Sequence, residues 1–253
     1  MKITIVTLFP NMIKGFVEES IIKRAVLQKL VEIEIINLRD FSEDKYRTVD
    51  GRPYGGGAGM ILRVDVLQRA VKSLNLQKKL SKTILTSAKG KVFNQKKALE
   101  LSRQEQLVII AGHYEGVDER VMDLIDEELS IGDFVLTGGE IAAAAFVDAI
   151  VRLIPGVLKK ETATAEESFF DLSIDRLIEV VGENEILMKL KKEGKARVTL
   201  LEYPQYTRPE KYEGKKVPAV LLSGNPKLIT DWQLKKAFDE TLKKRPDLLS
   251  KGV

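Results

Sequence analysis

The sequence predicts an α/β fold in which parallel strands are joined by helices. Through the first two thirds of the chain, short apolar runs rich in β-branched residues alternate with longer segments of helical spacing. The strand candidates cover residues 3–8, 32–38, 83–87 and 107–111. The helix candidates cover residues 11–29, 64–73 and 94–102, and Asn11 and Asn94 are the expected N-caps of the first and the last.

A further helix is predicted over residues 140–154. The stretch from Ile141 to Val147 is entirely apolar, and the helix is expected to stop before Pro155. A helix that lacks a polar face must be covered on most sides. We therefore expect this helix to pack deep in its domain or against another subunit.

The composition and the apolar periodicity of the sequence change after residue 155. We therefore predict three parts. Residues 1–158 form the α/β domain. Residues 159–202 begin with a polar stretch without apolar periodicity and are predicted to be a flexible interdomain linker. Residues 203–253 form a small helical domain that begins with a segment rich in turn formers. Amphipathic helices are expected over residues 175–192 in the linker and 231–244 in the last part.

The composition excludes several classes of chemistry. The 253 residues contain no cysteine and one histidine, so disulfides, thiolate nucleophiles and cysteine-based zinc sites are excluded, and no metal site is predicted. No apolar stretch approaches the roughly 18 residues of a membrane span. The N-terminus, Met1 to Val6, has the pattern of a strand and not of a secretion signal. We expect a cytoplasmic protein with no membrane partner.

Positive charge is concentrated at the C-terminal end of the chain. Residues 189–253 carry a net charge of +8, whereas residues 1–188 carry −4. This distribution would draw a polyanion such as RNA towards the C-terminal part. A lysine-rich solvated surface explains the charge equally well when no other observation is considered.

Residues 50–60, DGRPYGGGAGM, contain five glycines within nine positions. Glycine loses more backbone entropy on folding than other residues, so such a cluster indicates positive φ angles or a close approach to a ligand. The segment lacks the Lys-Ser/Thr ending of a P-loop and the spacing of a dinucleotide fingerprint. Neither nucleotide hydrolysis nor NAD chemistry is therefore supported, and a merely flexible loop is the alternative.

Two other segments contain glycines, one at the end of a predicted strand and one where the chain passes from a strand into the apolar helix. The strand 107–111 delivers Gly112, Tyr114 and Glu115 at its carboxyl end, where open α/β sheets bind ligands. For His113 a structural imidazole is favoured over a catalytic base, because no serine nucleophile elbow accompanies it. Residues 130–140, SIGDFVLTGGE, run directly into the apolar helix. Their backbone could frame an adenine, or could simply form a tight turn.

Five colinear motifs extend over nearly the whole chain: GRPYGGGAGM, AGHYEGVDER, SIGDFVLTGGE, RLIPGVL and YPQYTRPEKYEGKKVPAVLLSGN. Together they resemble the TrmD family of tRNA (guanine-N1) methyltransferases. The resemblance implies a SPOUT-type parallel sheet with a C-terminal trefoil knot, a small helical C-terminal domain that helps to hold tRNA, and a homodimer with active sites at the subunit interface. It also implies methyl transfer from S-adenosylmethionine to N1 of guanosine 37 of tRNA, immediately 3′ of the anticodon.

Carried over position by position, the family's S-adenosylmethionine pocket falls on loops that follow strands. The matching positions are Thr86, Ser87, Ala88, Gly112, Tyr114, Glu115, Ile131, Gly132, Asp133, Phe134, Val135, Leu136, Gly138 and Gly139. Where relatives have a Ser-Pro-Gln-Gly turn, this chain has Ser-Ala-Lys-Gly at residues 87–90. Backbone contacts are expected to persist there without a proline wall. The resemblance also implies that Mg²⁺ assists the reaction, although the sequence shows no site for it.

The family's catalytic pair matches Arg152 and the position before Ser168, where the usual aspartate is replaced by Glu167. N1 of guanine carries a proton that must leave, so a carboxylate base is required. Arg152 can stabilise the negative charge that develops on O6. The extra methylene of Glu167 shifts the carboxylate, and a displacement of about 1 Å can cost roughly 10²-fold in rate. Asp171 is the alternative base.

Two further functions stay open at this point. A SPOUT methyltransferase that acts on ribosomal RNA would share the donor pocket, but the glycine-rich segment and YTRPE favour the tRNA family. A catalytically silent RNA-binding relative would explain the replacement at Glu167 as loss of the base.

Overall fold

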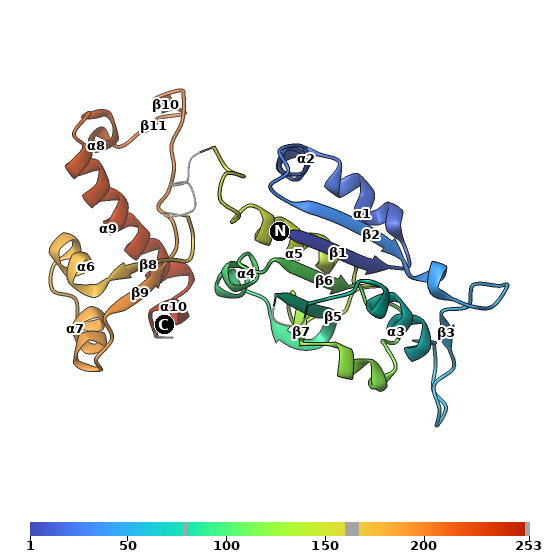
Figure 1. Ribbon diagram of the computed structural model, residues 1–253. Coiled ribbons are helices and arrows are strands. Elements are labelled where there is room, and N and C mark those ends of the chain that lie inside the picture. Colours follow the sequence, from blue (N-terminus) through green and yellow to red (C-terminus); the bar gives the residue numbers. More distant parts are fainter. Residues whose placement is uncertain (78–79, 160–166, 251–253) are drawn as a thin grey trace. The chain divides into compact units, whose positions relative to one another are not determined.

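The computed structural model describes residues 1–77, 80–159 and 167–250, which fall into two compact units divided after Lys159. The first unit is built on a five-stranded parallel sheet of order β2-β1-β6-β5-β7 (Figure 1). The predicted α/β fold with a parallel sheet is thereby confirmed. The strands are β1 (Lys2–Thr7), β2 (Glu32–Asn37), β5 (Ser81–Val92), β6 (Gln106–Ile110) and β7 (Glu127–Ser130).

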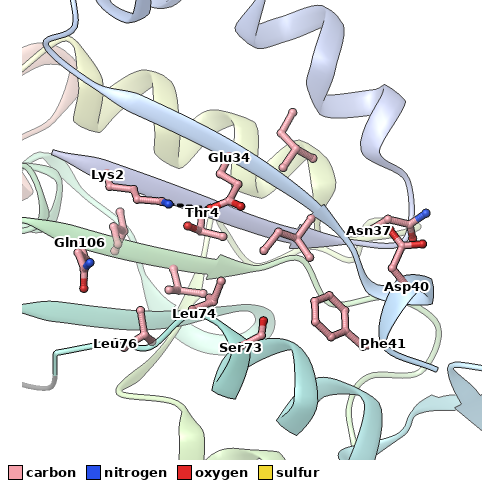
Figure 2. A pocket seen from close by; sticks show the side chains of 14 residues that line it. Lys2, Thr4, Glu34, Asn37, Asp40, Phe41, Ser73, Leu74, Leu76 and Gln106 are labelled. Atoms are coloured by element: carbon pink, nitrogen blue, oxygen red, sulfur yellow. Dashed lines mark ion pairs between the residues drawn. The ribbon is translucent and has the colours of Figure 1, made fainter. Parts of the chain in front are cut away.

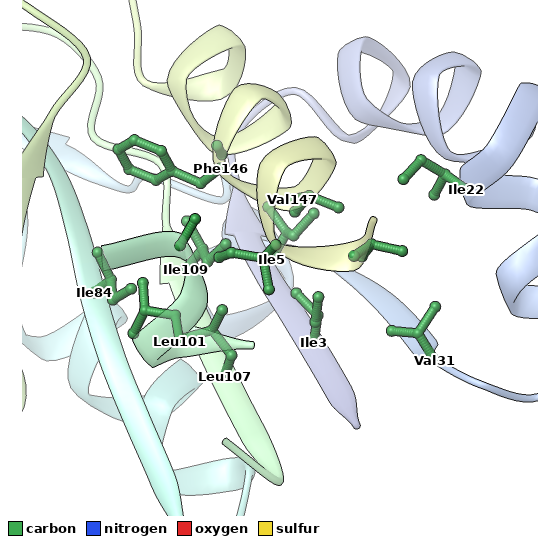
Figure 3. Packing of buried hydrophobic residues seen from close by; sticks show 14 of the residues in the cluster. Ile3, Ile5, Ile22, Val31, Ile84, Leu101, Leu107, Ile109, Phe146 and Val147 are labelled. Atoms are coloured by element: carbon green, nitrogen blue, oxygen red, sulfur yellow. The ribbon is translucent and has the colours of Figure 1, made fainter. Parts of the chain in front are cut away.

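One face of the sheet packs against four helices (Figure 3). Ile3, Ile5 and Ile109 project from β1 and β6 into this layer and are fully buried. Phe146 and Val147 of the apolar helix fill the space opposite them. The predicted deep position of that helix is thus confirmed. The helices of the layer are α1 (Pro10–Val17), α2 (Ser20–Leu27), α4 (Gln95–Leu101) and α5 (Glu140–Val151).

The other face has a separate core. Val6, Val108 and Ile110 alternate with the residues of the first layer along the same strands, so both faces of β1 and β6 are apolar. This explains why the strands appear in the sequence as continuous β-branched runs and not as alternating patterns. The covering elements are η1 (Leu38–Phe41), α3 (Val64–Ser73) and η2 (Glu119–Leu124).

The helix predicted over residues 11–29 is two helices, α1 and α2, and the second begins at Ser20, whose φ is 53°. The prediction of Asn11 as N-cap is wrong. The helix begins one residue earlier at Pro10, because the fixed φ and missing N–H of proline suit the first helical position. Asn94 is the N-cap of α4 as predicted, and its side chain accepts a 3.0 Å hydrogen bond from a backbone N–H.

The second unit combines a small antiparallel sheet with helices around its own core. Leu177, Leu187 and Phe238 are almost completely buried there. Its strands are β8 (Phe170–Ser173) and β9 (Arg197–Leu200), which pair with each other, and β10 (Lys211–Tyr212) and β11 (Lys215–Lys216). Its helices are α6 (Ile174–Val181), α7 (Glu185–Lys192), α8 (Ala219–Leu222), α9 (Pro226–Lys244) and α10 (Asp247–Ser250).

The division of the chain therefore differs from the predicted one. Residues 170–200, expected in a flexible linker, contribute two strands and two helices to the core of the second unit. The helix predicted over 175–192 is interrupted at Gly182, which has a φ of 86°, and α7 restarts at the side-chain cap Asn184. Residues 160–166 of the predicted linker lie outside the described residues.

The helix predicted over residues 231–244 also starts earlier than predicted. It begins at Pro226, five residues before Asp231, and Asn225 caps it by accepting hydrogen bonds from the backbone N–H groups of residues 227 and 228. None of the described helices combines the length and the apolar character that a membrane crossing requires.

Two neighbouring residues of α7 test whether this part of the chain is folded. Leu187→Ala removes a fully buried side chain and is expected to destabilise the second unit by about 2–5 kcal/mol. Ile186→Ala is the matched control, because Ile186 is 40% exposed, and it should change stability by less than about 1 kcal/mol. Urea unfolding followed by the fluorescence of Trp232, the single tryptophan, reports on this unit. Equal effects of the two substitutions would restore the flexible-linker interpretation.

Candidate active site

A cavity of about 300 Å³ lies beside the middle of β5, where its pairing with β7 shifts register, and between the segments that follow β6 and β7. The three strands are neighbours in the sheet, with β5 between β6 and β7. The chain crosses from one side of β5 to the other between β6 and β7, so the loops that follow these strands diverge around β5. Ligands of open α/β sheets bind at such a point.

Most of the sequence-predicted donor-binding residues line this one cavity, although they come from three separate segments. They are Thr86, Ser87, Ala88, Gly112, Tyr114, Glu115, Ile131, Phe134, Val135, Leu136, Gly138 and Gly139. Gly132 and Asp133 are not part of the lining. Gly132 instead lies under a neighbouring aromatic ring, since a Cβ added to it would come within 2.6 Å of Phe134.

Several other residues that line the cavity were not predicted from the sequence; they include Lys89, Gly116, Val117, Glu119, Met122 and Glu128. Glu128 was missed because β7 was not predicted as a strand. Its sequence, Glu-Glu-Leu-Ser, holds one apolar residue and no alternating pattern. His113 was noticed, but only its place in the fold shows that it belongs to the cavity wall.

The residues after Thr86 leave the sheet and return to it. Thr86 and Lys91 both pair with Leu129 of β7, so residues 87–90 are looped out of the ladder. This loop is the Ser-Ala-Lys-Gly turn, and it forms one wall of the cavity without a proline. The chain re-enters the ladder at Lys91, and a Cβ on the preceding Gly90 would come within 2.6 Å of the β7 backbone.

The walls of the cavity are joined by backbone contacts that leave no room for side chains. The N–H of Gly139 donates a 2.6 Å hydrogen bond to the carbonyl of Gly112, whose own N–H donates to Thr86 Oγ1 at 2.9 Å. A Cβ on Gly139 would lie 1.9 Å from that hydroxyl. His113 and Gly138 also form an isolated β-bridge. The glycines therefore permit the segments after β6 and before α5 to touch.

Tyr114 has a strained backbone within this wall. Its φ of 58° lies in the left-handed region, which is uncommon for an aromatic residue and costs of order 1–3 kcal/mol. Its ring is 40% exposed and contacts the imidazole of His113 edge-on, with ring centroids 4.9 Å apart. Strain of this kind is maintained only when the surroundings fix the segment on both sides.

The glycine-rich segment forms a hairpin whose base is attached to the same wall. Its strands are β3 (Asp50–Gly51) and β4 (Ile61–Leu62). Four of its glycines have positive φ, which explains the composition seen in the sequence. The N–H of Glu115 donates to the carbonyl of Met60 at 3.0 Å. Gly59 lies so close to the Glu115 side chain that a Cβ would approach its Cγ to 2.4 Å.

Behind the wall, Asp118 fixes the start of η2. Its carboxylate accepts hydrogen bonds from the backbone N–H and the guanidinium of Arg120. The hydrogen bonds from the Arg120 side chain hold the pKa of the Asp118 carboxyl below its usual value. This carboxylate therefore stays ionised at neutral pH and acts as a structural anchor, not as a base.

The two predicted catalytic residues lie in different units. Arg152 directly follows α5 as its C-cap, and the helix ends three residues earlier than predicted. Glu167 precedes β8, in a segment fixed by the bond from Phe169 N–H to the Leu200 carbonyl. The alternative base, Asp171, accepts a 2.6 Å hydrogen bond from the Thr199 hydroxyl on the neighbouring strand. That bond makes Asp171 a structural carboxylate on β8.

A second cavity, of about 430 Å³, lies on the α3 side of the sheet (Figure 2). Lys2 and Glu34 form a 2.9 Å ion pair at its edge, and Thr4 and Gln106 lie beside them. None of the sequence-predicted site residues lines it. Among the described residues, no group of three or more histidine, aspartate or glutamate side chains is placed to hold a metal ion in either cavity or elsewhere.

Comparison with known proteins identifies the relatives of this chain. Residues 1–251 match the family described as tRNA (Guanine-1)-methyltransferase TrmD. The chain belongs to this family. Curated relatives named tRNA (guanine-N(1)-)-methyltransferase are 49% identical in Dictyoglomus turgidum, 46% in Geobacter sp. strain M21 and 47% in Carboxydothermus hydrogenoformans. The matches cover 98–99% of this chain and 87–91% of the relatives.

The close approach at Gly139 can be tested by adding a single methyl group. Gly139→Ala should destabilise the first unit by about 1–3 kcal/mol, because the Cβ collides with Thr86 Oγ1 and with the Gly112 backbone. Gly15→Ala in α1 is the control. Nothing lies within 4 Å of its added Cβ, and alanine is favoured over glycine in a helix. Differential scanning calorimetry measures both, and a Gly139 variant as stable as the wild type would contradict the contact.

Proposed function

We propose that this chain transfers a methyl group from S-adenosylmethionine to N1 of guanosine 37 of tRNA, immediately 3′ of the anticodon. One observation carries the proposal. Motifs that are far apart in the sequence, and that the family shares, converge on a single cavity at the switch point of the sheet. The names of the relatives support the same reaction.

The chemistry of the cavity fits the methyl donor. Backbone groups at Gly112, Gly138 and Gly139 are accessible because these residues have no side chain, and they can hydrogen-bond an adenine. Tyr114 and Phe134 offer flat apolar faces, and Glu115 can accept hydrogen bonds from amino or hydroxyl groups. The volume lies at the lower end of small-molecule pockets, about 300–1,000 Å³. The donor supplies an electrophilic methyl group on a sulfonium, so the protein's task is mainly alignment.

Glu167 and Arg152 supply the chemistry at the acceptor base. Glu167 accepts the proton of guanine N1 as the nitrogen lone pair attacks the methyl carbon, while the bond from that carbon to sulfur breaks. Arg152 stabilises the negative charge that the loss of this proton places on O6. Glu167 is preferred to Asp171 as the base because it directly precedes Ser168, the position that matches the family's catalytic carboxylate.

The proposed homodimer is supported by apolar side chains at the rim of the cavity. Phe134 and Val135, which line the cavity, are each more than half exposed in a single chain, as is Ile141 of α5, which does not line it. Apolar residues gathered at the mouth of a site indicate an interaction surface. A second copy of the chain would cover them and complete the pocket. The trefoil knot belongs to the same proposal and rests on the membership of the chain in the TrmD family.

The second unit is proposed to hold the tRNA. The surplus of lysine and arginine lies within residues 189–253, which α7, α9 and the segment between them contribute. Phosphate groups would be attracted there whatever the base sequence. The reaction is proposed to take place in the cytoplasm, where tRNA is modified, and Mg²⁺ assistance stays a prediction that chelation by EDTA tests.

A pair of tRNA transcripts that differ only at position 37 tests the substrate. The transcript with guanosine should accept one labelled methyl group from S-adenosylmethionine, and the transcript with adenosine should accept none above background. Ribosomal RNA fragments are the control for the alternative substrate. Methylation of both transcripts, or of ribosomal RNA alone, would contradict the proposal, and methylation of none would indicate the silent RNA-binding relative.

Substitutions at the proposed base separate the two carboxylates. Glu167→Gln should lower kcat by about 10²–10⁴-fold, the usual contribution of a general base. Asp171→Asn should lower it far less, because this side chain serves the β8–β9 pair. Arg152→Ala should also lower kcat by roughly 10²-fold through loss of charge stabilisation. Single-turnover methylation measures each, and a larger loss at Asp171 than at Glu167 would reverse the assignment.

A further inference from the structure

Three distant segments meet at the side chain of Glu140, the first residue of α5. The hydroxyl of Thr7, at the end of β1, donates a 2.8 Å hydrogen bond to Glu140 Oε1. The same hydroxyl accepts a 2.9 Å bond from the N–H of Phe9. On the other side, Glu140 Oε2 faces Nδ1 of His113 at 3.5 Å. The carboxyl group thus connects β1, the loop after β6 and the start of α5.

The carboxyl group of Glu140 is unusually deeply buried for a glutamate. Glu140 is 1% exposed, and glutamate is almost never so deeply buried unless it is paired. Within the described part of the chain, Glu140 Oε2 and His113 Nδ1 each lack a hydrogen-bond partner, yet they face each other. Their separation is just beyond a normal hydrogen bond, so a small movement of the imidazole satisfies both atoms at once. The positive end of α5 also favours a carboxylate at its first residue.

The imidazole in turn holds the strained part of the cavity wall. His113 directly precedes Tyr114, whose φ is 58°, and its ring is packed between Phe9, at 4.8 Å, and Tyr114, at 4.9 Å. On the far side, the segment is fixed by the bond from Glu115 N–H to Met60. Glu140 therefore supplies the fixed point on the His113 side that the conformation of Tyr114 requires.

The second wall depends on the same group. A Cβ on Gly138 would lie 2.4 Å from both Glu140 Oε2 and His113 Nδ1. The Gly138 backbone is therefore seated directly on the facing pair, and Gly138 and Gly139 lead from there into α5. Both glycine-lined walls of the cavity thus rest on one buried carboxyl group.

We propose that Glu140 is a positioning residue for the methyl-donor pocket, which acts through Thr7 and His113. One carboxylate oxygen of Glu140 accepts a hydrogen bond from the Thr7 hydroxyl, and the other accepts one from the Nδ1–H of His113. Glu140 thereby fixes the tautomer and the orientation of the imidazole. The inference rests on the proposed donor site. It predicts that the network controls donor affinity more than tRNA affinity, because both walls that it holds belong to the donor cavity.

Two matched pairs of substitutions test this in the full-length protein. Thr7→Val removes the hydroxyl that Glu140 accepts, whereas Thr4→Val removes a similarly buried hydroxyl on the opposite face of β1. His113→Gln loses the group at Nδ1, whereas His113→Asn places an amide nitrogen near that position. Isothermal titration calorimetry with S-adenosylhomocysteine gives the dissociation constant. Thr7→Val should weaken the binding of S-adenosylhomocysteine about tenfold more than Thr4→Val, and His113→Gln about tenfold more than His113→Asn. A tenfold difference is the effect of one buried hydrogen bond.

The readings distinguish positioning from general loss of structure. The KM for tRNA should change less than about threefold in all four variants, an amount worth under 1 kcal/mol, and circular dichroism should show the same helix content as the wild type. Equal weakening within either pair would overturn the inference, because packing alone would then explain the effect. A wild-type protein that binds no S-adenosylhomocysteine while still methylating tRNA would instead overturn the proposed pocket, and the inference with it.

Discussion

The contact between the backbones of Gly112 and Gly139 is the constraint on which the rest of the site depends. Their 2.6 Å hydrogen bond joins the end of β6 to the beginning of α5, and the Thr86 hydroxyl fills the remaining space from β5. Three loops thereby enclose one cavity. The apolar character of α5 follows from the same arrangement, because a helix that starts against the sheet must continue through the core beside Ile5 and Ile109.

The proposed base of the reaction is positioned by the second unit. Glu167 stands before β8, and the next two residues are tied to the second unit through Ser168 Oγ, which accepts from Glu202 N–H, and through the Phe169 N–H. The proposed donor cavity, in contrast, is formed entirely by the first unit. The proposed donor binding and proton removal thus depend on separate hydrophobic cores.

The sequence predicted the parts of the fold that have a strong local signal. The β-branched runs predicted β1, β2 and β6 to within two residues, and the apolar helix was found with its start at Glu140. β7 was missed because its four residues carry little apolar content. Residues 170–200 were interpreted as a linker because each element adds only two or three residues to a core that also needs Phe238, distant in the sequence.

The site shows the same limit. Gly112, Tyr114 and Gly139 were predicted from the spacing of glycines and from the family motifs, and each of these signals is contained in a short stretch of the sequence. The order of β6, β5 and β7, which brings these segments together, is a property of the whole sheet. The Thr7, His113 and Glu140 network joins residues separated by up to 133 positions, and no spacing rule links them. Only packing reveals that a buried glutamate needs partners there.

The loop at residues 87–90 has one more consequence. Because Thr86 and Lys91 share the partner Leu129, residues 87–89 can change without altering the ladder, whereas Gly90 lies against the β7 backbone and has no room for a side chain. Substitutions at Ala88 and Lys89 can therefore reshape this wall of the cavity while the sheet stays intact. The affinity of a small molecule that contacts the side chains of residues 87–89 would therefore depend on those side chains, whereas that of a molecule bound to the backbone of Gly112 and Gly139 would not.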